Sequence, residues 1–195
     1  MLRKRRYAPL KRQKYAVYSL PANWEYPVRN SGIGESLWAT PQVIEELFAS
    51  DSKLKRRFLG FLRRDCCGVI HHLGGEWLSY AWMTKRGRNG PVHMPQPPEE
   101  DYCWIFHCGT KPAFRGQGLY KQSLFMLAVQ ARGCSKLLID TEVDNLSSRA
   151  AIVSVGFQPY GLVSTWTLAV PKIKSWNFAK WQQNQTLSGM ECRAA

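Results

Sequence analysis

The feature that most constrains the fold is a succession of strand, helix and strand within residues 102–142. Tyr102–Cys108 is a β-prone run. A helix follows, whose apolar residues recur at helical spacing and for which Gly133 suits the C-terminal cap. Lys136–Glu142 is then predicted to form a second strand. Two strands joined by a helix favour a right-handed crossover, so we expect these two strands to pair in parallel.

Patterns on both sides of this unit predict a mixed α/β (α+β) fold whose elements run β-α-α-β-β-β-α-β-α-β. Thr40 and Pro41 suit the N-cap and first position of a helix, and a second helix begins near Ser52. Gly74 and Gly75 separate two β-prone runs and predict a hairpin. The remaining elements are expected at residues 15–20 (strand), 68–73 and 76–83 (hairpin strands), 145–155 (short helix) and 164–170 (last strand).

The length of 195 residues suits one folded domain, and 45% hydrophobic residues are enough for a core. We expect this domain to span residues 15–171, with a basic, flexible arm over 1–14 and a polar C-terminal tail over 172–195. The longest unbroken apolar run, 124–129, is far shorter than the roughly 20 residues of a membrane-spanning helix. We therefore expect a cytoplasmic protein.

The charge balance is strongly basic, with 27 Lys and Arg against 14 Asp and Glu and a net charge of +13. Such a balance favours acidic partners, among them phosphorylated ligands, nucleic acid and acidic proteins. The cations of the second helix are typical of a solvated helix face, and they are Lys53, Lys55, Arg56, Arg57, Arg63 and Arg64. The six cysteines form no CxxC pair, so we expect free thiols and no metal.

The turn that opens the central helix is Arg115–Tyr120, with the sequence Arg-Gly-Gln-Gly-Leu-Tyr. Glycines at a helix N-terminus let the backbone approach an anion, and the exposed N–H groups and the helix dipole bind phosphate or pyrophosphate. The turn is not a Walker A loop, because no Gly-Lys-Ser/Thr follows, and it lacks the third glycine of a dinucleotide fingerprint. On its own it also fits a plain connection between a strand and a helix.

Two motifs together resemble the GCN5-related N-acetyltransferase (GNAT) family. The first is a proline three residues before Arg-x-x-Gly-x-Gly/Ala, and this chain has Pro112 before Arg115–Tyr120. The second is an Asn, a small residue three positions later and a Gly-Phe pair eleven positions after the Asn. Asn145, Ser148 and Gly156-Phe157 match it. The resemblance is carried by residues 102–161 and leaves out the arm and the tail.

The resemblance implies a GNAT-like mixed central sheet with helices on both faces, and an N-acyltransferase whose co-substrate is acetyl-CoA or another acyl-CoA. In the family, the amides of the turn hold the donor pyrophosphate. The backbone of the preceding strand pairs with the pantetheine arm and polarises the thioester carbonyl. The donor-binding residues implied by position are Phe106, His107, Cys108, Thr110, Arg115, Gly116, Gln117, Gly118, Leu119, Tyr120, Lys121, Asn145 and Ser148.

The catalytic groups are less fully matched. Many family members carry a Tyr as general acid four residues before the Gly of Gly-Phe, and here Ile152 stands there, which cannot donate a proton. Asp140 stands where some members carry a general base, and Glu142 lies on the same side of the strand. Cys108 is a third candidate, as a nucleophile, although the family transfers the acyl group directly. The phenol of Tyr120, which replaces the last Gly/Ala of the turn motif, either contacts the donor phosphates or points outward.

Alternatives remain open for the donor and for the class of function. An acidic acyl carrier protein is a second candidate donor, which Arg56, Arg57, Arg63 and Arg64 would dock. Nucleic-acid binding through the basic arm, or donor binding without turnover, are alternatives of another class. The acceptor is expected to be a small-molecule amine selected by residues 24–38 and 85–101. His107 is expected to pack in the strand, because a lone strand histidine is more often packed than catalytic.

Overall fold

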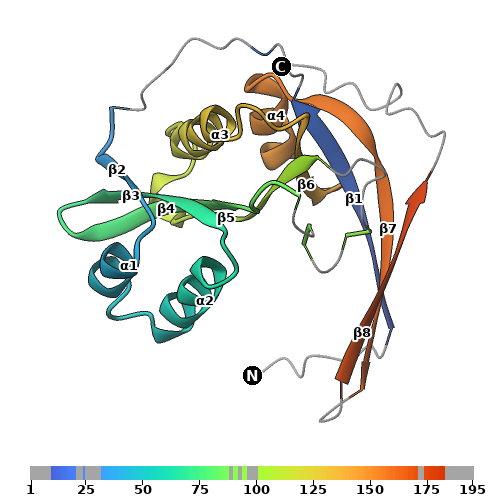
Figure 1. Ribbon diagram of the computed structural model, residues 1–195, viewed down its shortest axis with the longest axis horizontal. Helices are drawn as coiled ribbons and strands as arrows, with labels where there is room; N and C mark the ends of the chain where they lie inside the picture. The colour runs from blue at the N-terminus through green and yellow to red at the C-terminus, as the bar shows by residue number, and fades with distance from the viewer. Residues whose placement is uncertain are drawn as a thin grey trace.

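The protein folds around one eight-stranded sheet. The computed structural model describes residues 10–20, 24, 32–87, 90–91, 94–95, 101–170 and 174–182. The strands are β1 (Leu10–Leu20), β2 (Glu35–Trp38), β3 (Cys67–Leu73), β4 (Glu76–Met83), β5 (Tyr102–Thr110), β6 (Lys136–Glu142), β7 (Gln158–Val170) and β8 (Lys174–Gln182). Their order in the sheet is β2-β3-β4-β5-β6-β1-β7-β8 (Figure 1). Among the described strands every neighbouring pair is antiparallel except β5 and β6.

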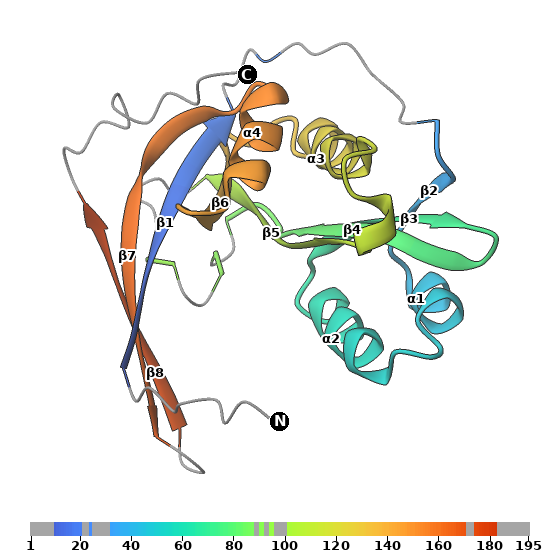
Figure 2. The ribbon, with the colours of Figure 1, turned by 180° about the vertical axis from the view of Figure 1, so that it is seen from behind.

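Helices cover both faces of this sheet, as Figures 1 and 2 show from opposite sides. They are α1 (Pro41–Leu47), α2 (Ser52–Leu62), α3 (Leu119–Gln130) and α4 (Leu146–Ser154), with a short 3-10 turn η1 (Pro112–Phe114) before α3. Helices α1 and α2 lie on one face, and α3 and α4 lie on the other. Each helix of the first pair starts at a side-chain cap, since Thr40 Oγ1 accepts from the Val43 N–H (3.2 Å) and Asp51 Oδ1 from the Leu54 N–H (2.9 Å).

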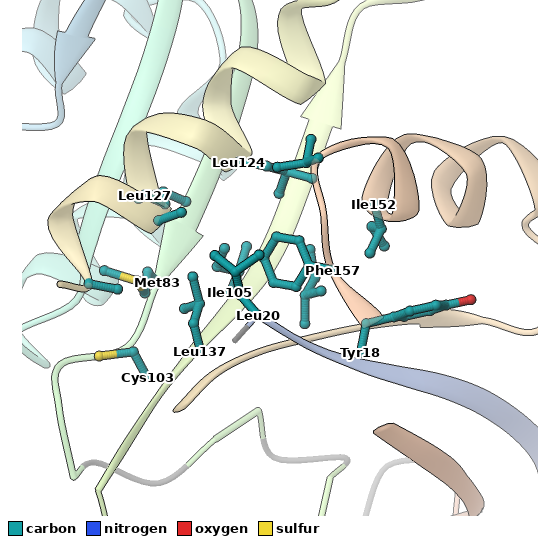
Figure 3. Packing of buried hydrophobic residues seen from close by; sticks show 14 of the residues in the cluster. Tyr18, Leu20, Met83, Cys103, Ile105, Leu124, Leu127, Leu137, Ile152 and Phe157 are labelled. Atoms are coloured by element: carbon teal, nitrogen blue, oxygen red, sulfur yellow. The ribbon is translucent and has the colours of Figure 1, made fainter. Parts of the chain in front are cut away.

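Two separate apolar layers hold the helices to the sheet. Under α3 and α4, Leu124, Leu127 and Ile152 pack on aliphatic side chains of the central strands such as Ile105 and Leu137 (Figure 3). The layer under α1 and α2 is mainly aromatic, and it contains Phe48, Phe58, Phe61, Trp77, Tyr80, Trp82 and Phe106. A third, smaller cluster on this second face joins Trp104 and Leu138 to Met94 of the 84–101 segment. The central strands are thus buried on both faces.

The structure confirms the mixed α/β class, with helices on both faces. The hairpin around Gly74 and Gly75 is β3–β4, and both glycines have the positive φ angles that such a turn uses (57° and 81°). The predicted parallel pair also forms, between Tyr102–Ile105 and Lys136–Ile139. Strand β2 is an addition that the sequence analysis did not predict.

Both ends of the sheet extend beyond the predicted folded range of 15–171. β1 begins at Leu10, inside the expected basic arm, because its first residues pair with β7 as far as Leu168. Its cations point to solvent and one, Arg12, lies 5.6 Å from the ring centre of Trp166, so charge does not prevent strand formation here. The expectation that residues 172–195 form only a polar tail was wrong, because 174–182 pair with β7 as β8. Residues 1–9 and 183–195 lie outside the described residues.

The described part of the chain holds no helix that is long and apolar enough to cross a membrane. Its five described cysteines, Cys66, Cys67, Cys103, Cys108 and Cys134, are all free thiols.

The aromatic layer under α2 predicts a stability effect at Gly68. A Cβ there would lie 2.8 Å from the indole of Trp82, which is fully buried between Phe58 and Phe61. Gly68→Ala should therefore lower the free energy of unfolding by about 1–3 kcal/mol, as overpacking does in other cores. Gly60→Ala on α2 is the control, because its Cβ would meet nothing within 4 Å. Helix propensity should make it stabilising by about 0.5–1 kcal/mol. Urea denaturation measures both, and equal effects would contradict this account.

Candidate active site

β5 and β6 separate halfway along their length. They pair only up to Ile105 opposite Ile139, after which β5 continues beside β4 and β6 continues beside β1. The backbone groups of residues 106–110 that face β6 consequently have no partner on that strand. Unpaired strand backbone of this kind is a template for an extended ligand, because N–H and C=O groups seek partners.

A β-bulge at His107 reshapes β5 where the two strands separate. Trp82 lies opposite Phe106 and Tyr80 lies opposite Gly109, so two residues of β5 face one residue of β4. His107 has φ of +48°, which is uncommon for a residue other than glycine, and such backbone strain often marks a functional site. The extra residue changes the facing of the side chains that follow it.

Regular strand alternation would place Phe106 and Cys108 on one face of the sheet and His107 on the other, and the bulge breaks this alternation. Phe106 and His107 both pack on the α2 side, with ring centres 5.0 and 5.3 Å from that of Phe61. Cys108 packs against the apolar cluster on the α3 side. Simple alternation fails because one residue of β5 has no counterpart on β4.

The glycine turn lies directly after β5. Gly116 and Gly118 have φ angles of +76° and +84°, and Gly118 is the N-cap of α3 without a side-chain cap. The first N–H groups of a helix have no acceptor inside the helix, so those of α3 are exposed at this turn together with the positive end of the helix dipole. A Cβ at Gly116 would meet nothing within 4 Å, so there is open space over the turn. The Arg115 Nε–H donates to the Thr110 carbonyl (3.3 Å) and fixes the turn to the end of β5.

The side chains of Tyr120 and Ser148 meet between α3 and α4, at the end of α4 that Asn145 caps. Tyr120 packs inward, and its hydroxyl lies 3.3 Å from Ser148 Oγ. The outward placement that the sequence also allowed for Tyr120 is therefore wrong. Asn145 caps α4 by accepting from the Ser148 N–H (3.2 Å). Ile152, the position without a general acid, is fully buried in the core.

The two candidate bases lie on β6 at the place where β5 leaves it. Asp140 is the first residue after the last β5–β6 pair, and its Oδ1 accepts from the Trp104 Nε1–H at 2.7 Å. Glu142 is exposed and accepts from Gln13 Nε2 at 2.5 Å. By strand alternation both carboxylates lie on the same face as Leu138, which is the face away from α3.

Burial sets the protonation of the two titratable groups at the bulge. It raises the pKa of the Cys108 thiol to about 12, and the charge of Asp140 adds to this. The thiol is therefore protonated at neutral pH, which is unfavourable for a nucleophile. Burial and then the charge of Arg57 lower the pKa of His107 to about 4, so its imidazole is neutral. The expectation that His107 packs rather than catalyses agrees with its ring contacts, which include Tyr80 at 5.5 Å.

Sequence reasoning missed several residues at this site. Tyr80 lies against the backbone of β5, because a Cβ at Gly109 would be only 2.6 Å from its hydroxyl oxygen. Arg57 was assigned to a solvated helix face, yet its Nη1 lies 3.4 Å from His107 Nε2. Arg149 is a buried cation that donates to the Tyr18 hydroxyl (3.0 Å) and the Val143 carbonyl (3.1 Å). Of these three, only Tyr80 had a signal in the sequence. That signal is Gly109, because a glycine inside a strand often marks close approach of another group.

The site therefore has two sides. The glycine turn, Cys108 and Tyr120 lie on the α3 face, whereas Asp140, His107 and Tyr80 lie on the opposite face. In the described part of the chain, no three side chains of the types that bind metals lie together.

Comparison with known proteins gives a family match and a set of similar folds. A family model described as "Acetyltransferase (GNAT) family" matches residues 33–157. No curated protein matches the sequence. A GNAT-family acetyltransferase from Colwellia psychrerythraea has 16% identity and a TM-score of 0.53, over 78% of this chain and 54% of that chain. This chain thus spans about half the length of the Colwellia protein.

Two aminoglycoside N-acetyltransferases also share the fold. AAC(6')-Iy, solved in complex with CoA, has 17% identity and a TM-score of 0.52, over 64% of this chain and 91% of that chain. AAC(6')-IG from Acinetobacter haemolyticus has 16% identity and a TM-score of 0.50, over 64% of this chain and 90% of that chain. At these identities the likeness concerns the fold alone.

The environment of His107 predicts an acid-dependent loss of stability. A histidine in the unfolded chain binds a proton near pH 6.5, whereas folded His107 does so only near pH 4. The free energy of unfolding should therefore fall as the pH drops from about 6.5 towards 4. His107→Asn, which tolerates positive φ, should reduce that fall by about 1 kcal/mol between pH 7 and 5, allowing for partial exposure of the ring. Urea denaturation at several pH values measures it, and an imidazole titrating near 6.5 by NMR would contradict it.

Proposed function

The chain belongs to the GNAT acetyltransferase family, and we propose that it transfers an acetyl or longer acyl group from acyl-CoA directly to an amine of a small molecule. The observation that carries this proposal is the joining of two features, the glycine turn at the N-terminus of α3 and the opening between β5 and β6 beyond Ile105. The glycine turn suits a pyrophosphate, and the opening suits an extended arm with amide groups. The CoA complex of AAC(6')-Iy, a protein of similar fold, supports the same donor.

The donor would lie on the α3 face. Its pyrophosphate would accept hydrogen bonds from the amides of residues 116–121, where two glycines with positive φ remove the side chains that would crowd it. Its pantetheine arm would pair with backbone groups of residues 106–110 that have no partner on β6, beside Asn145 and Ser148. A β5 N–H near the bulge would polarise the thioester carbonyl, a contribution of several kcal/mol where such donors are preorganised.

The amine would approach from the opposite face, where Asp140 lies. The nitrogen attacks the thioester carbon, the C–S bond breaks, the thiolate leaves as CoA, and the nitrogen loses one proton. Asp140 is the proposed acceptor of that proton, directly or through water, because it stands at the mouth of the opening on the amine side. Glu142, two residues further on the same face, is the alternative base.

The structure supports CoA over an acyl carrier protein as donor. The cationic helix that would dock an acidic carrier is α2, which covers the sheet face away from the glycine turn (Figures 1 and 2). A carrier bound to α2 would present its arm on the face of the sheet opposite the glycine turn.

A screen of amines that detects released CoA thiol tests the function, and comparing acyl-CoA with acyl carrier protein at equal concentration tests the donor. A cytoplasmic location remains a prediction.

The donor assignment predicts the effect of Gly118→Val. This substitution would place a branched side chain at φ +84° beside the proposed pyrophosphate, so acetyl-CoA affinity should fall tenfold or more. Gly133→Val is the matched control, because Gly133 has φ of +97° at the far end of α3 with open space around it. It should carry similar backbone strain without affecting affinity. Calorimetry on folded variants measures both, and unchanged affinity in Gly118→Val would remove the donor-site assignment.

The base assignment predicts the behaviour of Asp140→Asn. Asparagine keeps an oxygen that can accept from the Trp104 indole but cannot take up a proton, so kcat should fall roughly a hundredfold with acetyl-CoA affinity unchanged. The deficit should shrink as the pH approaches the pKa of the amine, because the acceptor then arrives deprotonated. Glu142→Gln is the comparison variant. If it shows the larger loss, Glu142 is the base, and if neither variant loses activity, solvent removes the proton.

A further inference from the structure

Two arginines, Arg57 of α2 and Arg64 in the turn after it, lie against the aromatic layer that backs the bulge. Arg57 Nη1 is 3.4 Å from His107 Nε2, and the Arg64 guanidinium lies 5.2 Å from the centre of the Phe61 ring. Among the residues that the structure describes, neither arginine forms an ion pair. Lys55 on the same helix differs, since it pairs with Glu45 at 2.9 Å. The two guanidinium groups therefore have no ion-pair partner among the described residues.

These cations are close to the reacting region through direct contacts. Phe61 touches both Arg64 and His107, with a ring distance of 5.3 Å to the latter. His107 is the residue at which β5 bulges, and it lies within the segment 106–110 that would hold the pantetheine arm and the thioester. Arg57 thus borders the opening between β5 and β6 on the face from which the amine would approach.

The histidine does not neutralise Arg57, because it is itself uncharged. A guanidinium can only donate, so His107 Nε2 must accept and its proton must sit on Nδ1. Its stacking on Tyr80 fixes the ring in this orientation. The contact positions Arg57 and leaves its other N–H groups to bind an anion, for which the planar guanidinium offers a bidentate fork.

Strand β6, on the other side of the opening, carries negative charge. Asp140 lies on β6 on the same face of the sheet, at the first position where β5 no longer pairs. The amine side of the opening therefore has carboxylates on β6 and guanidinium groups on α2 and the turn that follows it. A ligand whose ammonium faces the first and whose anionic group faces the second would match both.

We propose that the amine acceptor carries an anionic group, a carboxylate or a phosphate, and that Arg57, held by His107 and flanked by Arg64, binds that group. This inference rests on the proposed function, because it names the substrate class of the same site. Arg57 acts on specificity and not on the chemical step, so its loss should change KM more than kcat.

The test compares pairs of amines that differ only in the anionic group. One pair is an amino acid and its carboxamide, and the other is an aminoalkyl phosphate and the corresponding amino alcohol. The parent protein should prefer the anionic member of at least one pair at least tenfold in kcat/KM, and the pair that shows it identifies the anion. Preference for the neutral members of both pairs would overturn the proposal.

Variants of Arg57 and Arg56 then test which residue is responsible for the preference for anionic acceptors. Arg57→Gln should raise KM for the anionic acceptor tenfold or more, while kcat, KM for acetyl-CoA and KM for the neutral acceptor stay within twofold. Arg57→Lys should recover only part of the loss. Arg56→Gln removes an equal charge from the same helix, at a residue with no described partner, and should change nothing. Equal shifts in the Arg56 and Arg57 variants would show a general charge effect and overturn the proposal.

Failure of this inference is distinguishable from failure of the proposed function. If the proposed function is wrong, the parent protein releases no CoA thiol with any amine. If only the anion site is wrong, the parent turns over neutral amines and Arg57→Gln behaves like the parent. Because Arg57 is exposed, the variant should keep its fold, which the unchanged KM for acetyl-CoA confirms.

Discussion

The separation of β5 from β6 beyond Ile105 is the constraint on which the rest of the site depends. A sheet that paired these strands to their ends would satisfy its backbone and leave nothing for a ligand to bind. Here the pairing stops while both strands continue, each held by its other neighbour. The β6-facing groups of residues 106–110 have no partner on β6, and a ligand that pairs with them recovers hydrogen bonds that the sheet gave up.

The bulge at His107 is part of this arrangement, and its neighbours hold it in place. An uncommon backbone conformation persists only where its surroundings enforce it, and here the ring is held by Phe58, Phe61 and Tyr80. The aromatic layer under α2 therefore has two roles. It buries one face of β3 and β4, and it fixes the shape of β5 at the opening. Gly109 belongs to the same design, since any side chain there would collide with Tyr80.

How far the sequence predicts this structure depends on how local each signal is. The caps at Thr40 and Asn145, the Gly74-Gly75 hairpin and the glycine turn all depend on residues a few positions apart, and each is found where its residues predict it. The bulge gives no such signal, because His107 is not a glycine and its conformation depends on helix α2, about fifty residues earlier. β8 was missed because its pairing partner, β7, supplies much of its stability. Arg57 was missed because a cation on a helix surface looks the same whether it faces solvent or a site.

The two-sided geometry also bears on the order of chemical events. A covalent acyl-cysteine would need Cys108 as a thiolate near neutral pH, but burial holds its pKa at about 12. His107 turns to the other side of the sheet, and the buried histidine on the α3 face, His71, already has both ring nitrogens hydrogen-bonded, to Ser36 and Ser123. In the proposed arrangement donor and amine enter from opposite faces, so both can be bound at once and the nitrogen can meet the thioester carbon through the opening between β5 and β6. The proposed arrangement therefore favours a ternary complex and direct transfer over a two-step route through the protein.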